Sequence, residues 1–226
     1  MASSSDDNGG SFASFLEGWL VRQEHYLDEL LSADLNCHES SDDDLSELVS
    51  RILAHYQQYY EEKSRVAARD AFRVFSPPWL TSLERAFLWI AGFKPGLAFR
   101  IVDDSVGDLS EDQARSIGRL AQETRSEERA LNDELARIQE SVAAPPLLGI
   151  AMRGGRRLVD GEQDEADSTL ESLKAAMEAV LSAADSLRTT TALKIMEVLR
   201  PAQCVKFLLA AGQLHLRLRS WGLERE

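Results

Sequence analysis

Apolar residues recur at intervals of three and four along most of the chain, which is the spacing of a helix with one buried face. The first such series predicts a helix from Phe12 to Leu31. Its members are Phe12, Phe15, Leu16, Trp19, Leu20, Tyr26, Leu27, Leu30 and Leu31. Because all of these fall on one face, the helix needs another element to cover it.

A second series follows an acidic segment, residues 32–47, that contains six acidic residues and no Lys or Arg. Negative charge suits the N-terminus of a helix, so we expect a second helix to begin near Asp42–Asp44. Its apolar residues continue from Leu45 to Tyr60, and the helix is expected to reach as far as Phe72. Pro77 and Pro78 end whatever precedes them, since a residue before proline avoids helical angles.

The segment Ser76–Gly96, SPPWLTSLERAFLWIAGFKPG, joins this stop to a capped apolar stretch. Thr81 and Glu84 have the spacing of a capping box at a helix N-terminus. We expect a helix from there to Ala91, which buries Leu83, Phe87, Leu88, Ile90 and Ala91. Gly92 and Lys94-Pro95 then form a stop and a restart.

Helical spacing resumes in the second half of the chain. Ser110 and Gln113 form another capping box, and the segment from there to about Val142 fits either one long helix or two helices with a break. Pro145-Pro146 stops it, and Gly149–Gly161 reads as a loop. The remaining expected elements are a short helix at Leu97–Val102, a helix at Leu170–Leu187, a short apolar segment at Ala192–Leu199, and a last helix from Pro201 to Trp221 that Gly222 ends.

Strand signals are nearly absent, so the fold class is all-α, a single bundle of about seven or eight helices whose long members are broken at Pro and Gly. We expect residues 1–10 to be a disordered leader, residues 11–226 to form the domain, and residues 143–163 to include a mobile loop.

Composition narrows the function. The 25 Lys and Arg against 38 Asp and Glu leave a net charge of -13, which argues against direct binding of nucleic acid. No apolar run approaches the roughly 20 residues that cross a bilayer. Cys37 and Cys204 form no CxxC pair, so reduced thiols are the default. We expect an intracellular protein of the nucleus or the cytoplasm, or both.

No catalytic constellation is present. The sequence has no GxSxG, no phosphate-binding glycine loop and no HExxH motif. The pairs Glu61-Glu62 and Glu127-Glu128 fall where we expect exposed charge. Cys37-His38 lies in an acidic loop without the spacing of a metal site. We therefore expect no enzyme, no metal and no cofactor.

Four segments resemble the delay-of-germination domain family of plants, which includes seed-dormancy regulators, pollen-aperture factors and the C-terminal regions of TGA-type leucine-zipper transcription factors. They are FASFLEGWLVRQEHYLDEL, SPPWLTSLERAFLWIAGFKPG, LSEDQARSIGRLAQETRSEERAL and ADSLRTTTALKIMEVLRPAQCVKFLLAAGQLHLRLRSWG. The resemblance spans about Phe12 to Gly222. It implies a non-catalytic regulator of plant development, in dormancy or pollen-aperture patterning, that binds other proteins, and it leaves self-association open.

The resemblance also bears on mechanism. TGA-type factors place a basic region and a zipper ahead of this domain, and those segments contact DNA. Here about ten polar residues precede the first expected helix. We therefore expect any effect on transcription to be indirect.

The same resemblance assigns roles to particular residues. Trp79, Glu84, Trp89, Gly92 and Pro95 are expected to be structural residues of the family motif, with Trp89 in the core. The N-terminal helix of dormancy-type relatives is implicated in partner binding. Phe15 and Trp19 are therefore candidates for an exposed partner surface, and ordinary helix packing is the alternative.

Arg153, Arg156 and Arg157 flank Gly154-Gly155 and form the one local basic cluster. They are candidates for contact with an anion or an acidic partner, and a plain linker is the alternative.

His215 is a candidate haem ligand in an alternative function, a ligand-sensing module that binds haem or a lipid-like molecule. Dormancy-type relatives carry a second histidine four residues later, where this chain has Arg219. The pairing that a two-histidine haem site would need is therefore missing.

Overall fold

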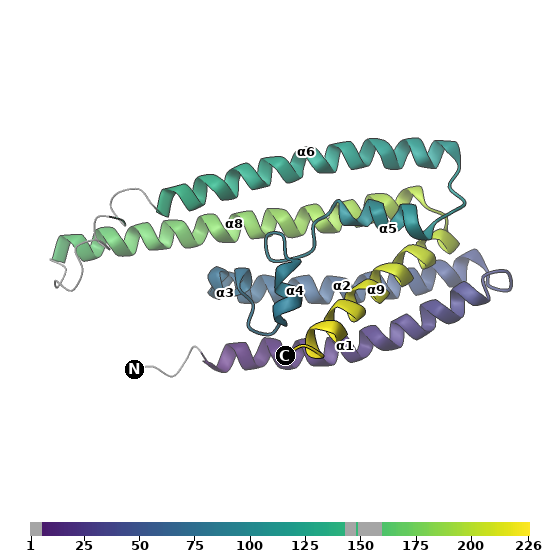
Figure 1. Ribbon diagram of the computed structural model, residues 1–226, viewed down its shortest axis with the longest axis horizontal. Coiled ribbons are helices and arrows are strands. Elements are labelled where there is room, and N and C mark those ends of the chain that lie inside the picture. Colours follow the sequence, from purple (N-terminus) through teal and green to yellow (C-terminus); the bar gives the residue numbers. More distant parts are fainter. Residues whose placement is uncertain (1–5, 143–147, 149–159) are drawn as a thin grey trace.

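The computed structural model describes residues 6–142, 148 and 160–226. These residues form eight helices and no strand, which confirms the all-α prediction (Figure 1). The helices are α1 (Asp6–Leu35), α2 (Asp42–Arg69), α3 (Ala71–Phe75), α4 (Ser82–Ala86), α5 (Leu97–Ser105), α6 (Glu111–Val142), α8 (Asp160–Val198) and α9 (Pro201–Leu223).

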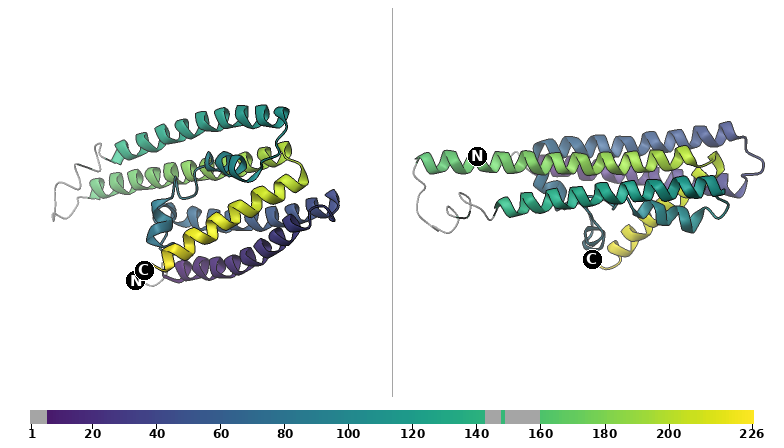
Figure 2. Two further views of the ribbon diagram at one scale, coloured as in Figure 1. Left: turned by 45° about the vertical axis from the view of Figure 1, so that its right-hand side comes forward. Right: turned by 90° about the horizontal axis from the view of Figure 1, so that it is seen from above.

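The helices form two layers. The long helices α6 and α8 lie side by side as an antiparallel pair, and α1, α2 and α9 form the other layer, with α4 and α5 near the boundary (Figures 1 and 2). The largest core cluster draws from both layers, with Leu30, Ile52, Val102, Ile195 and Val205 all at 1% exposure or less. Most of the apolar residues predicted to face the core are covered by another helix, but Leu31 of α1 and Leu170 of α8 are 44% and 46% exposed.

The N-terminal helix starts earlier than expected. It begins at Asp6, so the leader expected at residues 1–10 is helical from that residue onward. Trp19 is 1% exposed, its indole nitrogen donates a hydrogen bond of 2.9 Å to the backbone carbonyl of His55, and the two rings stack with centroids 4.3 Å apart. This contact fastens α1 to α2.

His55 is itself buried, and no partner within the described residues binds its Nε2 atom. Burial lowers the pKa of His55 from 6.5 to about 4, and the positive charge of Arg22 acts in the same direction. The imidazole is therefore neutral in the folded protein near pH 7.

The long helices run without the breaks considered from the sequence. Residues 111–142 form one helix, and the helix expected to end near Leu187 continues through the separately assigned segment Ala192–Leu199 as far as Val198. Thr189 donates its hydroxyl to the carbonyl of Asp185 one turn earlier, and buried Thr191 pairs with Thr124 of α6. The hydroxyl groups of Thr189 and Thr191 thus have partners without interrupting the helix.

The central helix is shorter than predicted. The Thr81–Glu84 capping box is present, but α4 ends at Ala86, and Phe87 is 53% exposed rather than buried. Ile90 and Ala91 have φ values of 45° and 57°, which no right-handed helix allows. The expected helix from Thr81 to Ala91 is therefore wrong beyond its first turns, and residues 87–96 form a loop, called here the 87–96 loop.

The last helix also differs from expectation at its end. Pro201 occupies the first turn as predicted, but α9 continues through Gly222 to Leu223. Gly222 is needed for a close approach, because a Cβ there would collide with the side chain of Thr81 at the N-terminus of α4. Gly222 therefore allows α9 to pack closely against the start of α4, and it does not end the helix.

We predict that Gly222→Ala lowers the free energy of unfolding by about 1–3 kcal/mol, because the added methyl must displace Thr81. Gly118→Ala on α6 is the matched control, since nothing lies within 4 Å of its Cβ position. The control should gain about 0.5–1 kcal/mol from helix propensity. Urea unfolding followed by circular dichroism measures both, and equal effects of the two substitutions would contradict the close approach.

We also predict an acid-sensitive contribution to stability from His55. Because its folded pKa lies below its unfolded value, this contribution is complete above pH 6.5 and is lost as the pH falls toward 4. Between pH 7 and pH 5 the loss amounts to about 2 kcal/mol. His55→Phe keeps an aromatic ring and removes the titration. Its urea stability should fall less than that of the unmodified protein over this interval, and parallel pH profiles would refute the assignment.

Candidate functional site

A cavity of about 820 Å³ lies where α2, α8 and α9 meet the 87–96 loop. Most of its lining is apolar, and a volume of this size is typical of a small-molecule site. The apolar part includes Leu53, Leu88, Ala98, Ile101, Ala192, Leu193, Met196, Phe207, Leu208, Ala211 and Leu214.

One wall of this cavity carries a buried ion cluster. Lys63 of α2 lies 2.8 Å from Asp185 Oδ1 of α8, and Arg188 Nη1 lies 2.5 Å from the same oxygen. Two cations therefore share one carboxylate, and the exposed fractions of the Lys63 and Arg188 side chains are only 3% and 6%. Desolvation lowers the pKa of Lys63 to about 8, the attraction of Asp185 opposes this, and the charge of Arg188 reinforces it.

Arg188 also holds the 87–96 loop in place. Its Nε donates to the carbonyl of Phe93 at 2.7 Å, and its Nη2 donates to the carbonyls of Ile90 at 2.9 Å and of Trp89. A Cβ at Gly92 would approach the guanidinium carbon to 2.6 Å, so only glycine leaves room for Arg188 here. The guanidinium thus supplies the donors that the loop carbonyls would otherwise lack.

Tyrosines line the cavity beside the cluster. They are Tyr59 and Tyr60 of α2. Burial raises the pKa of Tyr60 to about 12 and raises that of Tyr59 further. Both therefore stay protonated and act as hydrogen-bond donors near pH 7.

His215 lines the cavity from α9. Its ring packs against Trp19 and meets Phe93 edge-on, with centroid distances of 5.7 and 6.0 Å. Burial lowers the pKa of His215 to about 4, so its imidazole is neutral near pH 7. Arg219, at the position of the second histidine of dormancy-type relatives, lies 3.3 Å from Glu84 and takes part in an ion pair.

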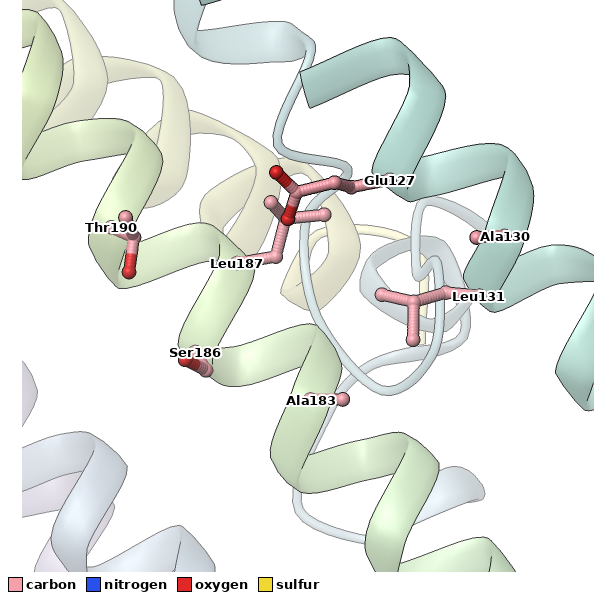
Figure 3. Close-up of a pocket in the computed structure, with 7 residues that line it drawn as sticks. All are labelled: Glu127, Ala130, Leu131, Ala183, Ser186, Leu187 and Thr190. Atoms are coloured by element: carbon pink, nitrogen blue, oxygen red, sulfur yellow. The ribbon is translucent and has the colours of Figure 1, made fainter. Parts of the chain in front are cut away.

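A smaller cavity of about 380 Å³ lies between α6 and α8 (Figure 3). Figure 3 shows small and aliphatic side chains of the two helices on its walls, with Glu127 as its sole charged group. It lacks the convergent polar groups of the larger cavity, and we do not assign a site to it.

The structure locates the residues singled out from the sequence, beginning with the proposed partner surface. Trp19 is buried and packs in the core, so it is not part of an exposed surface in this fold. Phe15 is half-buried among the aromatic residues at the start of α1. For Trp19, the alternative of ordinary helix packing is therefore the one that the structure shows. The candidates Arg153, Arg156 and Arg157 lie outside the described residues.

The family-motif residues lie around the 87–96 loop. Trp79 packs with Phe12 at 4.5 Å between ring centroids, and buried Glu84 caps α4. Trp89 was expected in the core, but it is half-buried and donates its indole N–H to Asn132 at 2.8 Å. Gly92 and Pro95 line the cavity.

Sequence reasoning missed several buried charges. It did not single out Lys63, Asp185 or Arg188, and it treated Glu128 as exposed, whereas this residue is 4% exposed and accepts a hydrogen bond of 2.6 Å from the backbone of Gly96. One signal in the sequence would have identified Lys63 as buried. Its neighbours three and four residues away on the helix are apolar or aromatic, and they include Tyr59, Tyr60 and Ala67.

Within the described residues, no group of three His, Cys, Asp or Glu side chains converges on a metal position. In the same ranges, every helix is too short or too polar to span a bilayer.

Comparison with known proteins supports the resemblance seen in the sequence. Residues 27–104 match the family described as DOG1, seed dormancy control. The chain is 39% identical to the Arabidopsis thaliana protein RESPONSE TO ABA AND SALT 1 over 95% of this chain and 96% of that protein. It is 42% identical to the Arabidopsis protein ZW2, over 94% and 96% of the two chains. It is 30% identical to the Arabidopsis transcription factor TGA2, over 97% of this chain and 66% of that protein.

These matches cover both helical layers and the loop between them. The chain therefore belongs to the DOG1 seed-dormancy-control family.

Proposed function

We propose that this protein is a non-catalytic regulator of plant development that acts by binding another protein, so that any effect on transcription is indirect. Its similarity over nearly the whole chain to RESPONSE TO ABA AND SALT 1 and to ZW2 supports the regulatory role. The family description favours seed dormancy as the setting. Pollen-aperture patterning and residence in the nucleus or cytoplasm stay predictions.

The observation that carries the proposal is an exposed stripe on α1. Steps of four and three residues place its members along one face, and all are exposed. They are Glu17, Val21, Glu24, Asp28, Leu31 and Leu35. Val21 and Leu35 are 67% and 73% exposed, so neither contributes to the core. We call these six residues the α1 stripe.

The α1 stripe favours a helical partner of basic character. Alternating steps of four and three are the spacing of a coiled-coil seam, which a second amphipathic helix can cover. The three acidic residues of the stripe, in a chain of net charge -13, favour Lys or Arg beside the partner's apolar side chains. Trp19 contributes indirectly, because its buried ring holds α1 in position, whereas Phe15 packs on the opposite face of the helix and is not part of the stripe.

We predict that the double substitution Val21→Asp and Leu35→Asp reduces partner recovery at least about tenfold while leaving the melting temperature nearly unchanged, because exposed positions tolerate substitution. Recovery is measured by quantitative mass spectrometry of proteins captured from plant seed extract on the purified chain. Leu170→Asp, at a residue of α8 that is 46% exposed, is the matched control. Equal recovery by the double variant and the unmodified chain would remove the α1 stripe from the proposal.

Trp19→Ala should behave differently from the stripe variants. It deletes a buried indole and its hydrogen bond to the His55 carbonyl, so we predict a loss of about 3–5 kcal/mol in the free energy of unfolding. Chemical unfolding measures this loss. If Trp19→Ala left stability intact and removed only partner recovery, Trp19 would be a contact residue after all.

The 820 Å³ cavity favours a second candidate function, a ligand-sensing module that binds haem or a lipid-like molecule. Neutral His215 could supply one nitrogen to haem iron, whereas Arg219 cannot supply another. Titration with haem should then give a Soret band that His215→Ala abolishes. Absence of the band from the unmodified protein would exclude haem, and displacement of a fluorescent fatty-acid probe would test the lipid-like ligand separately.

A further inference from the structure

The large cavity contains a lysine in an environment that favours reaction with a carbonyl compound. We propose that Lys63 is a nucleophilic amine that captures an apolar aldehyde bound in this cavity as an imine. The proposal rests on the ligand-binding function suggested above and adds the chemical class of the ligand and the atom that holds it. It follows from the position of Lys63, from the charges around it and from the lining of the cavity.

The position keeps Lys63 away from bulk water. Lys63 lines the cavity, yet the whole residue is only 2% exposed. Bulk water therefore does little to stabilise its ammonium form, and a bound ligand must displace neighbouring side chains to meet the amine. Lys94 lines the same cavity but has a side chain that is 52% exposed and lies 3.4 Å from Glu128. The two lysines share a cavity and differ in hydration.

The charges around Lys63 nearly cancel without its own proton. Asp185 is the acid that pairs with Lys63, but it is paired with Arg188 at 2.5 Å as well. Arg188 cannot lose its proton in a protein, and its bonds to the carbonyls of the 87–96 loop keep it beside Asp185. Lys63 is thus the group of the three that can become neutral, and its lowered pKa of about 8 agrees with this geometry.

The same balance of charge favours a neutral carbonyl over a carboxylate. With Lys63 deprotonated, Arg188 and Asp185 form a neutral pair, and no net positive charge is left for an anionic ligand. The hydroxyl groups of Tyr59 and Tyr60 can donate hydrogen bonds to a carbonyl oxygen in the cavity. The rest of the lining, which includes Leu88, Met196 and Leu214, suits an alkyl or terpenoid body.

The reaction needs no oxidant or cofactor. The lone pair of Nζ attacks the carbonyl carbon, the C=O π electrons move to oxygen, and a proton transferred from nitrogen to oxygen gives a carbinolamine. Asp185, within hydrogen-bond distance of Nζ, can carry that proton. Loss of the hydroxyl group as water then forms the C=N bond, so amine and aldehyde give imine and water. Desolvation and a neighbouring cation are known means of activating lysine in this way.

The test is reductive trapping on the full chain. The protein is incubated at pH 8 with decanal and cyanoborohydride, which reduces an imine to a stable secondary amine, and each lysine is quantified by peptide mass spectrometry. We expect Lys63 to be alkylated at least about tenfold faster than Lys94, because the lowered pKa of Lys63, about 8, leaves much of its amine neutral at the pH of the experiment. Exposed Lys194 serves as a reference outside the cavity. Alkylation of Lys63 no faster than that of Lys94 would overturn the proposal.

Two further measurements separate this proposal from the ligand-binding function. Lys63→Arg keeps the positive charge and forms no imine, so it should lose the alkylation at this site and keep its circular dichroism spectrum. Decanol, which cannot form an imine, should slow alkylation of Lys63 in the unmodified chain by competing for the cavity. If decanol displaces a fluorescent apolar probe but Lys63 is not trapped, the cavity binds ligands and the amine proposal fails. If neither occurs, both fail.

Discussion

The arrangement of this molecule depends on the buried guanidinium of Arg188. A buried cation is costly unless it is paired and fully hydrogen-bonded, and Arg188 meets this requirement with Asp185 and with the carbonyls of the 87–96 loop. The loop in turn adopts left-handed angles at Ile90 and Ala91, which an isolated chain would avoid. The buried guanidinium needs the loop carbonyls as acceptors, and the loop needs the guanidinium to hold its conformation. The positions of α8 and of the 87–96 loop are therefore fixed together.

This interaction also determines the shape and chemistry of the large cavity. The loop forms one side of it, and the ion cluster of α2 and α8 places the amine of Lys63 on its wall. A cluster with two cations and one carboxylate is a poor device for stability alone, since well-packed apolar groups commonly do as well. The cluster therefore both holds the 87–96 loop on α8 and supplies the charged groups of the proposed ligand site.

The two faces of the N-terminal helix α1 lie in different environments. Its inner face, with Trp19 stacked on His55, packs against α2, while the α1 stripe, with three acidic and three apolar residues, faces solvent. Membership of the DOG1 family places the chain among plant regulatory proteins, and the relatives it matches include a transcription factor that carries a similar region. The α1 stripe and the large cavity are the two separate features on which the proposed partner binding and ligand binding rest.

Local patterns in the sequence determined the helical class, the starts of most helices and the family. The capping boxes at Thr81 and Ser110 and the proline at position 201 act through neighbours within one turn, so they can be recognised without the fold. Tertiary structure decided the end of α4, the role of Gly222 and the burial of Lys63 and Glu128. Each of these depends on a partner about 30 to 140 residues away, such as Arg188 for the loop or Thr81 for Gly222. Apolar periodicity shows that a face is buried, but it does not show which distant charge or methyl group lies against it.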